Sequence, residues 1–408
     1  MTKLTVPWGR RLSDDEKRLI DQLRQRLKGE IPAKYDSDFN LFRWILSAEK
    51  QVKPKEVLDT AEKALRHHLR YRAVYRLDQI SVPKLDENPL FRDRLYPTGH
   101  LLDQCDRQNR LLWYMEYGSL NVEAIVRKVK SSDLHLYYFW QFEEMLRIVM
   151  EHEAKTGLMS GIHHVLDLSG YEVNPFTMLF ITNGSLAYYS HLLHYEHYPE
   201  IVCLTQIVNP SRWISVPYRL IKGAMPSGFS DRFRLHDGQG TEQLLKDIPI
   251  DYLPDVLGGA NPNLRSLPAR TIEEDEFHQW DDNQSSDLVH LNIGPRRRKI
   301  VPVEVNEART RISWYFTTDA DVYVGMFYSE NHDILSAKSI NTERMEMAYP
   351  WIKLCARHIP ESGRVLCSKT GVYYLIFCNK NAWFSRRNVQ LKLEVESKLC
   401  RLDRTFSM

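Results

Sequence analysis

Histidine clusters are the first candidates for chemistry in this chain of 408 residues. His191, His194 and His197 are spaced by three residues, so they share one face if the segment is helical. Three histidines can hold zinc, yet the run ends at Pro199 and no local carboxylate or cysteine set completes a strong motif. The alternative is a helix face whose imidazoles pack or meet water, and we predict no metal site.

A second candidate is the pair His163-His164 beside Asp167, which suggests acid–base chemistry. The segment has the apolar character of a strand, and neighbouring strand residues point to opposite faces, so the pair cannot act on one substrate atom. Residues 238–243 begin like a dinucleotide fingerprint but lack its third glycine, and the chain has neither a Walker loop nor a Gly-x-Ser-x-Gly elbow. We therefore predict that the protein is not an enzyme and needs no cofactor.

Charge gives one further candidate, the basic run Arg296-Arg297-Arg298-Lys299. It either meets anionic lipid headgroups or is a solvated turn. The whole chain carries 55 basic and 53 acidic residues, a net charge of +2, whereas a dedicated nucleic-acid binder normally has a strong basic excess. We expect no nucleic-acid partner.

The N-terminal residues, the distribution of apolar residues and the spacing of the cysteines indicate a cellular location. The first seven residues contain no apolar core of a secretory signal, and no stretch approaches the roughly 18 apolar residues of a membrane span. Six cysteines lie scattered without CxxC spacing, which is typical of reduced thiols. We expect a cytoplasmic protein whose membrane contact is peripheral.

Residues 10–80 have the sequence pattern of a small helical lobe. Ser13 to Glu16 form a capping box ahead of a helical stripe, a second helix is expected after Asp38, and a third after Pro54. A composition of 43% hydrophobic residues is enough for a sizeable core.

Residues 90–260 alternate short apolar strands with helices. Strands are predicted at 111–117, 162–168 and 201–208, and helices at 134–153 and 186–194. This alternation predicts crossover units and a mainly parallel sheet, hence an α/β domain.

The rest of the chain has a different period. Residues 261–287 contain Asn-Pro-Asn and an acidic run, so we expect a linker or extended connection. Residues 288–397 alternate with a period of two, as in Ile312, Trp314 and Phe316, which predicts an antiparallel sheet or all-β sandwich.

Six short motifs follow one another between Asp36 and Gly259. They are Phe39-Asn40-Leu41-Phe42-Arg43-Trp44-Ile45-Leu46-Ser47-Ala48, the turn from Asp103 to Arg110, Leu166-Asp167-Leu168-Ser169-Gly170, Tyr198-Pro199-Glu200, Pro217-Tyr218-Arg219-Leu220-Ile221-Lys222 and Leu253-Pro254-Asp255-Val256-Leu257-Gly258-Gly259. In this order they resemble the CRAL-TRIO lipid-binding family. The resemblance implies a helical N-terminal lobe and a mainly parallel sheet with a gate helix, which together bind and transfer one hydrophobic ligand.

The C-terminal region resembles a GOLD domain. The carrying segments are 361–367, 371–379 and the alternating stretch 389–395. The resemblance implies a β-sandwich that can hold a protein partner. An alternative function is therefore a membrane-trafficking or signalling adaptor that acts through this domain, with the lipid as regulator.

The resemblance also implies the residues around the ligand and its gate. We expect the ligand to contact Trp113, Met115, Ile162, His164, Glu200, Ile207, Ile221 and Arg232. The expected gate runs from Trp213 to Met225 and opens at a transiently bound membrane surface. Its apolar and basic side chains are Trp213, Ile214, Arg219, Leu220, Lys222 and Met225.

The class of lipid stays open in the sequence. In the family, the Glu of the Tyr-Pro-Glu motif, here Glu200, helps to bind inositol phosphate. Its basic partner aligns with Asp231, so a phosphoinositide would need Arg232 or Arg234 instead. Small hydroxyl residues that meet choline headgroups are replaced by Ile162 and His164. The candidates are a phosphoinositide, phosphatidylcholine, tocopherol, squalene or a retinoid.

Overall fold

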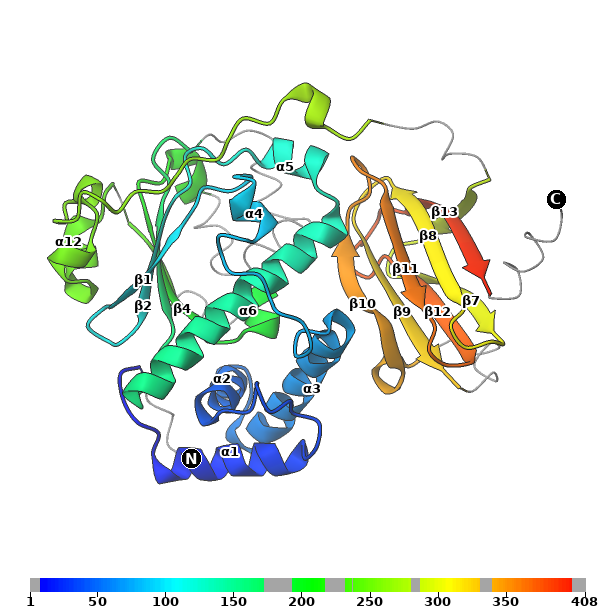
Figure 1. Ribbon diagram of the computed structural model, residues 1–408, viewed down its shortest axis with the longest axis horizontal. Coiled ribbons are helices and arrows are strands. Elements are labelled where there is room, and N and C mark those ends of the chain that lie inside the picture. Colours follow the sequence, from blue (N-terminus) through cyan, green and yellow to red (C-terminus); the bar gives the residue numbers. More distant parts are fainter. Residues whose placement is uncertain are drawn as a thin grey trace.

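The computed structural model describes residues 8–171, 193–216, 232–236, 238–279, 287–330 and 340–397. These ranges build a helical lobe, a mixed sheet crossed by a long helix and a β-sandwich beside them, as Figure 1 shows. No helix within the described ranges is long and apolar enough to cross a membrane.

The predicted N-terminal helices are confirmed. Ser13 and Glu16 form a capping box at the start of the first helix, and the side chain of Ser37 caps the second. Ile20 and Leu23 of the first helix and Leu65 of the last are fully buried, so the apolar stripes face each other. The elements are α1 (Asp14–Arg26), α2 (Asp38–Glu49), η1 (Pro54–Glu56) and α3 (Val57–Tyr75).

The central sheet has the strand order β1-β2-β3-β4-β5, antiparallel between β1 and β2 and parallel across the rest. The predicted mainly parallel sheet is therefore confirmed. Helix α6 crosses one face of it (Figure 1). The elements are α4 (Pro89–Arg92), β1 (His100–Cys105), β2 (Leu111–Glu116), α5 (Val122–Lys128), α6 (Ser131–Thr156), β3 (Ile162–Asp167), α9 (Leu193–His197), β4 (Val202–Val208), β5 (Phe233–Leu235), α12 (Thr241–Asp247), η3 (Ile250–Tyr252) and η4 (Asp255–Leu257).

The two faces of this sheet bury different cores. Trp113, Ile162 and Ile207 belong to the large core that includes α6 and the N-terminal lobe. Leu112 of β2, Val165 of β3 and Val208 of β4 belong to a smaller core with Leu244 of α12. Side chains alternate along a strand, so each short apolar strand contributes to both cores.

The C-terminal region is an antiparallel β-sandwich of two four-stranded sheets, ordered β10-β9-β12-β7 and β11-β8-β13-β6. Ile312, Trp314 and Phe316 are buried as the alternation predicted, whereas Val395 near the end of the last strand is 46% exposed. The elements are β6 (Val289–Ile293), β7 (Arg298–Val305), β8 (Arg311–Thr318), β9 (Val322–Ser329), η8 (Thr342–Arg344), β10 (Glu346–Leu354), β11 (Glu361–Leu366), β12 (Gly371–Cys378) and β13 (Arg387–Glu396).

The sandwich is hydrogen-bonded to the α/β part through α3 and the start of α6. Arg70 donates to the carbonyl oxygens of Thr342 and Met345 at 2.9 and 2.8 Å. The backbone N–H and the hydroxyl of Ser132 donate to Glu361 at 2.9 and 2.6 Å. Two separate helices therefore fix the sandwich against the rest of the molecule.

Residues 261–279 of the segment expected to be a linker lie along the α/β part in extended form (Figure 1). Leu267 forms an isolated antiparallel bridge with Thr98, and Ile272 is only 9% exposed. Its short helical turn η5 (Glu274–Glu276) presents Glu276 to Lys128, with a 2.5 Å contact. The segment is thus attached at several points before it reaches the sandwich.

Candidate functional site

One face of the central sheet brings together five of the eight predicted ligand residues. Trp113 and Met115 lie on β2, Ile162 and His164 on β3 and Ile207 on β4. The register pairs Trp113 with His164, and Met115 and Ile207 both with Leu166. Because side chains of paired residues point to the same side of a sheet, these five form one continuous wall.

The centre of this wall is a stacked pair of rings. The planes of Trp113 and His164 are 20° apart and their centroids 4.7 Å apart. On the other side of His164 in the sheet, β4 presents Thr205, which is 4% exposed. Sequence reasoning missed Thr205, whose hydroxyl adds a second polar group beside His164 on a mainly apolar face.

A charged cluster lies just before β4. Glu200 is 2% exposed and its backbone is left-handed, with φ of 60°. Its carboxylate accepts a hydrogen bond from Arg232 and a 2.8 Å hydrogen bond from Lys50. The guanidinium of Arg232 also lies 5.3 Å from the centre of the Tyr195 ring. Two cations therefore contact one buried carboxylate.

Arg232 retains a donor that its protein neighbours do not use. Its Nε is buried and has no hydrogen-bond partner among the described residues. A buried guanidinium N–H without a partner is costly unless a ligand or water accepts from it. The cluster therefore suits a ligand group that carries a phosphate or another acceptor.

The sequence predicted that Arg232 or Arg234 supplies the cation that binds a lipid phosphate. Of these two arginines, only Arg232 contacts Glu200. Arg234 instead contacts Asp247 at 2.7 Å and is about half exposed. Asp231, the position aligned with the family's basic partner, lies outside the described residues. Lys50 was missed, because 150 residues separate it from Glu200 and no local pattern links them.

The predicted gate is described only at its start. Residues 212–216 are helical, with Trp213 75% and Val216 57% exposed, whereas Ile214 is 7% exposed. This short helix therefore has an outward apolar side as well as a buried one. The remaining predicted residues lie outside the described part of the chain: Arg219, Leu220, Ile221, Lys222 and Met225.

The second histidine motif has a structural explanation. His163 is fully buried, lies 2.8 Å from Asp106 through Nδ1 and 2.9 Å from Gln206 through Nε2, and belongs to the face opposite His164. Burial lowers the pKa of His163. Asp167 accepts hydrogen bonds from Ser169 at the strand end. The three motif residues thus hold the sheet and its turn and do not meet at one point.

A different histidine set comes closest to a metal site. His67, Glu196 and His197 offer ligand atoms within 4.8 Å of one another, whereas His194 stacks on Phe142. Sequence reasoning missed this set because His67 comes from α3, far away in the chain. Nε2 of His67 already lies 3.3 Å from the carboxylate of Glu196, and His197 packs in an aromatic cluster, so the geometry has an explanation without a metal.

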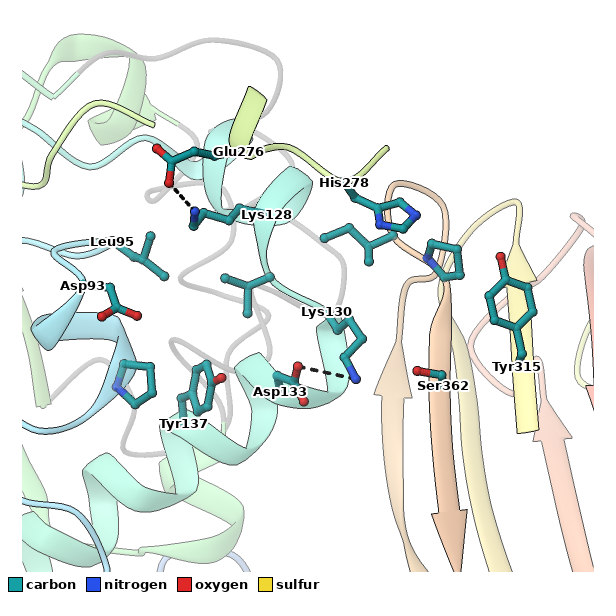
Figure 2. A pocket seen from close by; sticks show the side chains of 14 residues that line it. Asp93, Leu95, Lys128, Lys130, Asp133, Tyr137, Glu276, His278, Tyr315 and Ser362 are labelled. Atoms are coloured by element: carbon teal, nitrogen blue, oxygen red, sulfur yellow. Dashed lines mark hydrogen bonds and ion pairs between the residues drawn. The ribbon is translucent and has the colours of Figure 1, made fainter. Parts of the chain in front are cut away.

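Two cavities open beside these elements. One of about 330 Å³ lies between α6 and the β1–β2 edge and reaches the wall at Trp113. The other, of about 460 Å³, lies between the α/β part and the sandwich. Figure 2 shows that its cations are already paired, Lys128 with Glu276 and Lys130 with Asp133. Of these two cavities, the first is the one that reaches a residue of the predicted ligand wall.

Comparison with protein families matches three consecutive regions. Residues 12–80 match a domain of unknown function (DUF8435), and residues 100–259 match the CRAL/TRIO domain. Residues 277–399 match the description "F28H7_8_C:-like, C-terminal domain". The β-sandwich is thus matched under another name, and the GOLD domain stays a prediction.

Curated relatives match over most of the chain. CRAL-TRIO domain-containing protein F28H7.8 of Caenorhabditis elegans is 23% identical over 89% of this chain and 86% of its own length. Protein ctg-1 of the same organism is 20% identical over 88% of this chain and 92% of its own. SEC14 cytosolic factor of Candida glabrata is 24% identical over 59% of this chain and 76% of its own.

Among solved structures, the crystal structure of Sfh5 matches with a TM-score of 0.36 and 16% identity. It covers 58% of this chain and 84% of that one. A likeness at this level carries no conclusion about function.

Proposed function

We propose that this chain, whose residues 100–259 match the CRAL/TRIO domain, binds one lipid in a gated pocket and transfers or presents it at membranes. The match to this domain and the likeness to SEC14 cytosolic factor support lipid binding and transfer in general. The pocket, its gate and the membrane contact are the specific part of the proposal.

The observation that carries the proposal is the one-sided wall of Trp113, Met115, Ile162, His164 and Ile207. An apolar wall of this kind would accept acyl chains or an isoprenoid tail. The charged cluster of Glu200, Arg232 and Lys50, placed just before β4, would accept a headgroup. A phosphate near the unused Nε of Arg232 would gain a charge-assisted hydrogen bond.

A gate follows from the size of the hydrophobic effect. A lipid with two acyl chains hides about 30 methylenes from water, which is worth roughly 25 kcal/mol at about 0.8 kcal/mol each. Release into water is then negligible, so exchange needs an opening that faces a bilayer. Trp213 and Val216 are exposed apolar side chains where such a gate is predicted to begin.

Transfer of a fluorescent lipid between donor and acceptor vesicles tests this proposal. We expect the double substitution Trp213→Ala and Val216→Ala to slow transfer while the amount of bound lipid stays constant. Ile250→Ala is a matched control, since Ile250 is 50% exposed at a site away from the wall. Equal transfer rates in all three proteins would contradict the gate.

The proposed location is the cytoplasm with peripheral attachment to membranes. The name of the relative SEC14 cytosolic factor supports the first part of this assignment. If the protein carries no lipid and transfers none, the adaptor function through the C-terminal domain becomes the better proposal. A protein partner retained by the full chain without lipid would then be expected.

A further inference from the structure

The loop between β12 and β13 exposes two large aromatic side chains at one tip of the sandwich. Trp383 is 69% and Phe384 is 93% exposed. A single exposed apolar residue needs no explanation, but two adjacent aromatic rings in water are costly. Their position calls for an apolar or interfacial environment.

The loop around these rings is well anchored. Asn379 is 3% exposed, and its side-chain amide donates to the carbonyl oxygens of Ile293, Gly294 and Ser385 at 2.9–3.3 Å. The backbone of Asn379 also exchanges hydrogen bonds with Arg296 and Arg297, and so joins this loop to the β6–β7 turn. The aromatic pair therefore projects from a fixed base.

The same two loops bring cations around the rings. The guanidinium of Arg296 lies 3.5 Å from the centre of the Trp383 ring. Arg297 and Arg386 are also exposed, and none of these three arginines forms an ion pair with a carboxylate of the described residues. The turn between β8 and β9 holds two carboxylates: Asp321 is engaged by Lys353 at 3.2 Å, and Asp319 accepts hydrogen bonds from Asn388.

We propose that this tip, formed by Trp383, Phe384, Arg296, Arg297 and Arg386, is a membrane-docking site for bilayers that contain anionic lipid. Aromatic rings favour the boundary between headgroups and acyl chains, and arginines beside them pair with phosphates. The charge of the tip complements an anionic surface, and its projecting rings can enter a bilayer. The inference rests on the proposed function, because it supplies a second contact with the membrane at which lipid is exchanged.

Binding of the full chain to vesicles of phosphatidylcholine alone or with phosphatidylserine tests the tip. We expect tight binding only to the anionic vesicles, weakened by salt. Trp383→Ala with Phe384→Ala should lower the partition coefficient at least tenfold, and each arginine replaced by alanine about fivefold. The thermal midpoint should hardly change, since these side chains are exposed.

The matched control is Arg364→Ala with Leu366→Ala on β11, which removes one exposed cation and one exposed apolar side chain elsewhere on the sandwich. Tip variants that bind anionic vesicles as the wild type does would overturn the inference and favour a protein partner for the rings. Bound lipid is measured in the same samples by mass spectrometry. If the wild type carries lipid but the tip substitutions leave vesicle binding unchanged, the tip is not the docking site and the proposed function still stands. If the wild type carries no lipid, the proposed function itself fails.

Discussion

The ring of Trp113 on β2 stacks on the ring of His164 on β3, 4.7 Å between centroids, at the middle of the sheet face that we assign to the lipid. We expect His164→Ala to lower co-purifying lipid several-fold. The loss of stability should be small, about 0.5–1.5 kcal/mol for one ring pair. Bound lipid per protein and chemical denaturation measure the two effects.

Val165 is the matched control for this substitution, because it follows His164 and belongs to the core on the opposite face of the sheet. Val165→Ala should cost stability, about 1–3 kcal/mol, and leave the lipid content unchanged. If both substitutions deplete the lipid equally, the wall is misassigned.

The unused donor of Arg232 predicts a selective effect on headgroups. Arg232→Ala should weaken binding of phosphate-bearing lipids about tenfold, since a charged hydrogen bond is lost, and spare tocopherol or squalene. Arg234→Ala, which removes the contact with Asp247, should change neither class. Competition for a fluorescent lipid in the pocket measures the affinities. Equal losses for charged and uncharged ligands would rule out a headgroup role.

Acid should destabilise the contact between α3 and α9 through His197. The imidazole of His197 lies beside His67, Glu196 and Tyr71, and burial lowers its pKa from 6.5 to about 4. Between these values the unfolded chain binds the proton and the folded chain does not, so stability falls as the pH is lowered from 6.5 to 4. The full effect is about 3 kcal/mol. Denaturation across this range should show a flatter profile for His197→Phe, and an unchanged slope would refute the assignment.

Glu361, which lies where the sandwich meets α6, should give stability the opposite dependence on pH. Burial raises the pKa of Glu361 from 4.5 to about 7, although Ser132 donates two hydrogen bonds to it. Here the folded chain retains a proton that the unfolded chain releases, so stability falls as the pH rises from 4.5 to 7, by about 3 kcal/mol. Glu361→Gln keeps one oxygen acceptor for Ser132, cannot ionise and should therefore remove this slope. A variant that titrates like the wild type would show that Glu361 does not cause it.

Local features of the fold were predictable from the sequence. The capping box at Ser13 and the alternation around Trp314 depend on residues close in the chain, where spacing reveals the element. The parallel sheet was inferred from the order of strands and helices along the chain. The strand register then placed the predicted wall residues on one face. The family motifs supplied the candidate positions, and periodicity alone could not have identified them.

Contacts between distant residues could not be predicted in this way. Arg43, inside the first family motif, is 1% exposed and donates to Glu153 of α6 at 2.6 Å, across 110 residues. The pairing of Lys50 with Glu200 and the approach of His67 to Glu196 have the same character. The packing of whole helices and strands determines such pairs, and local sequence spacing does not indicate them. Glu196 itself was overlooked although it lies within the histidine run.

If the pocket holds a single lipid, that lipid should co-purify with the protein. The full chain is purified under native conditions from a lipid-containing host, extracted with organic solvent, and the extract is identified and quantified by mass spectrometry. We predict one dominant lipid at close to one molecule per chain, reduced in His164→Ala and retained in Val165→Ala. A protein that co-purifies with no lipid and also binds none of a panel of labelled lipids would contradict this prediction.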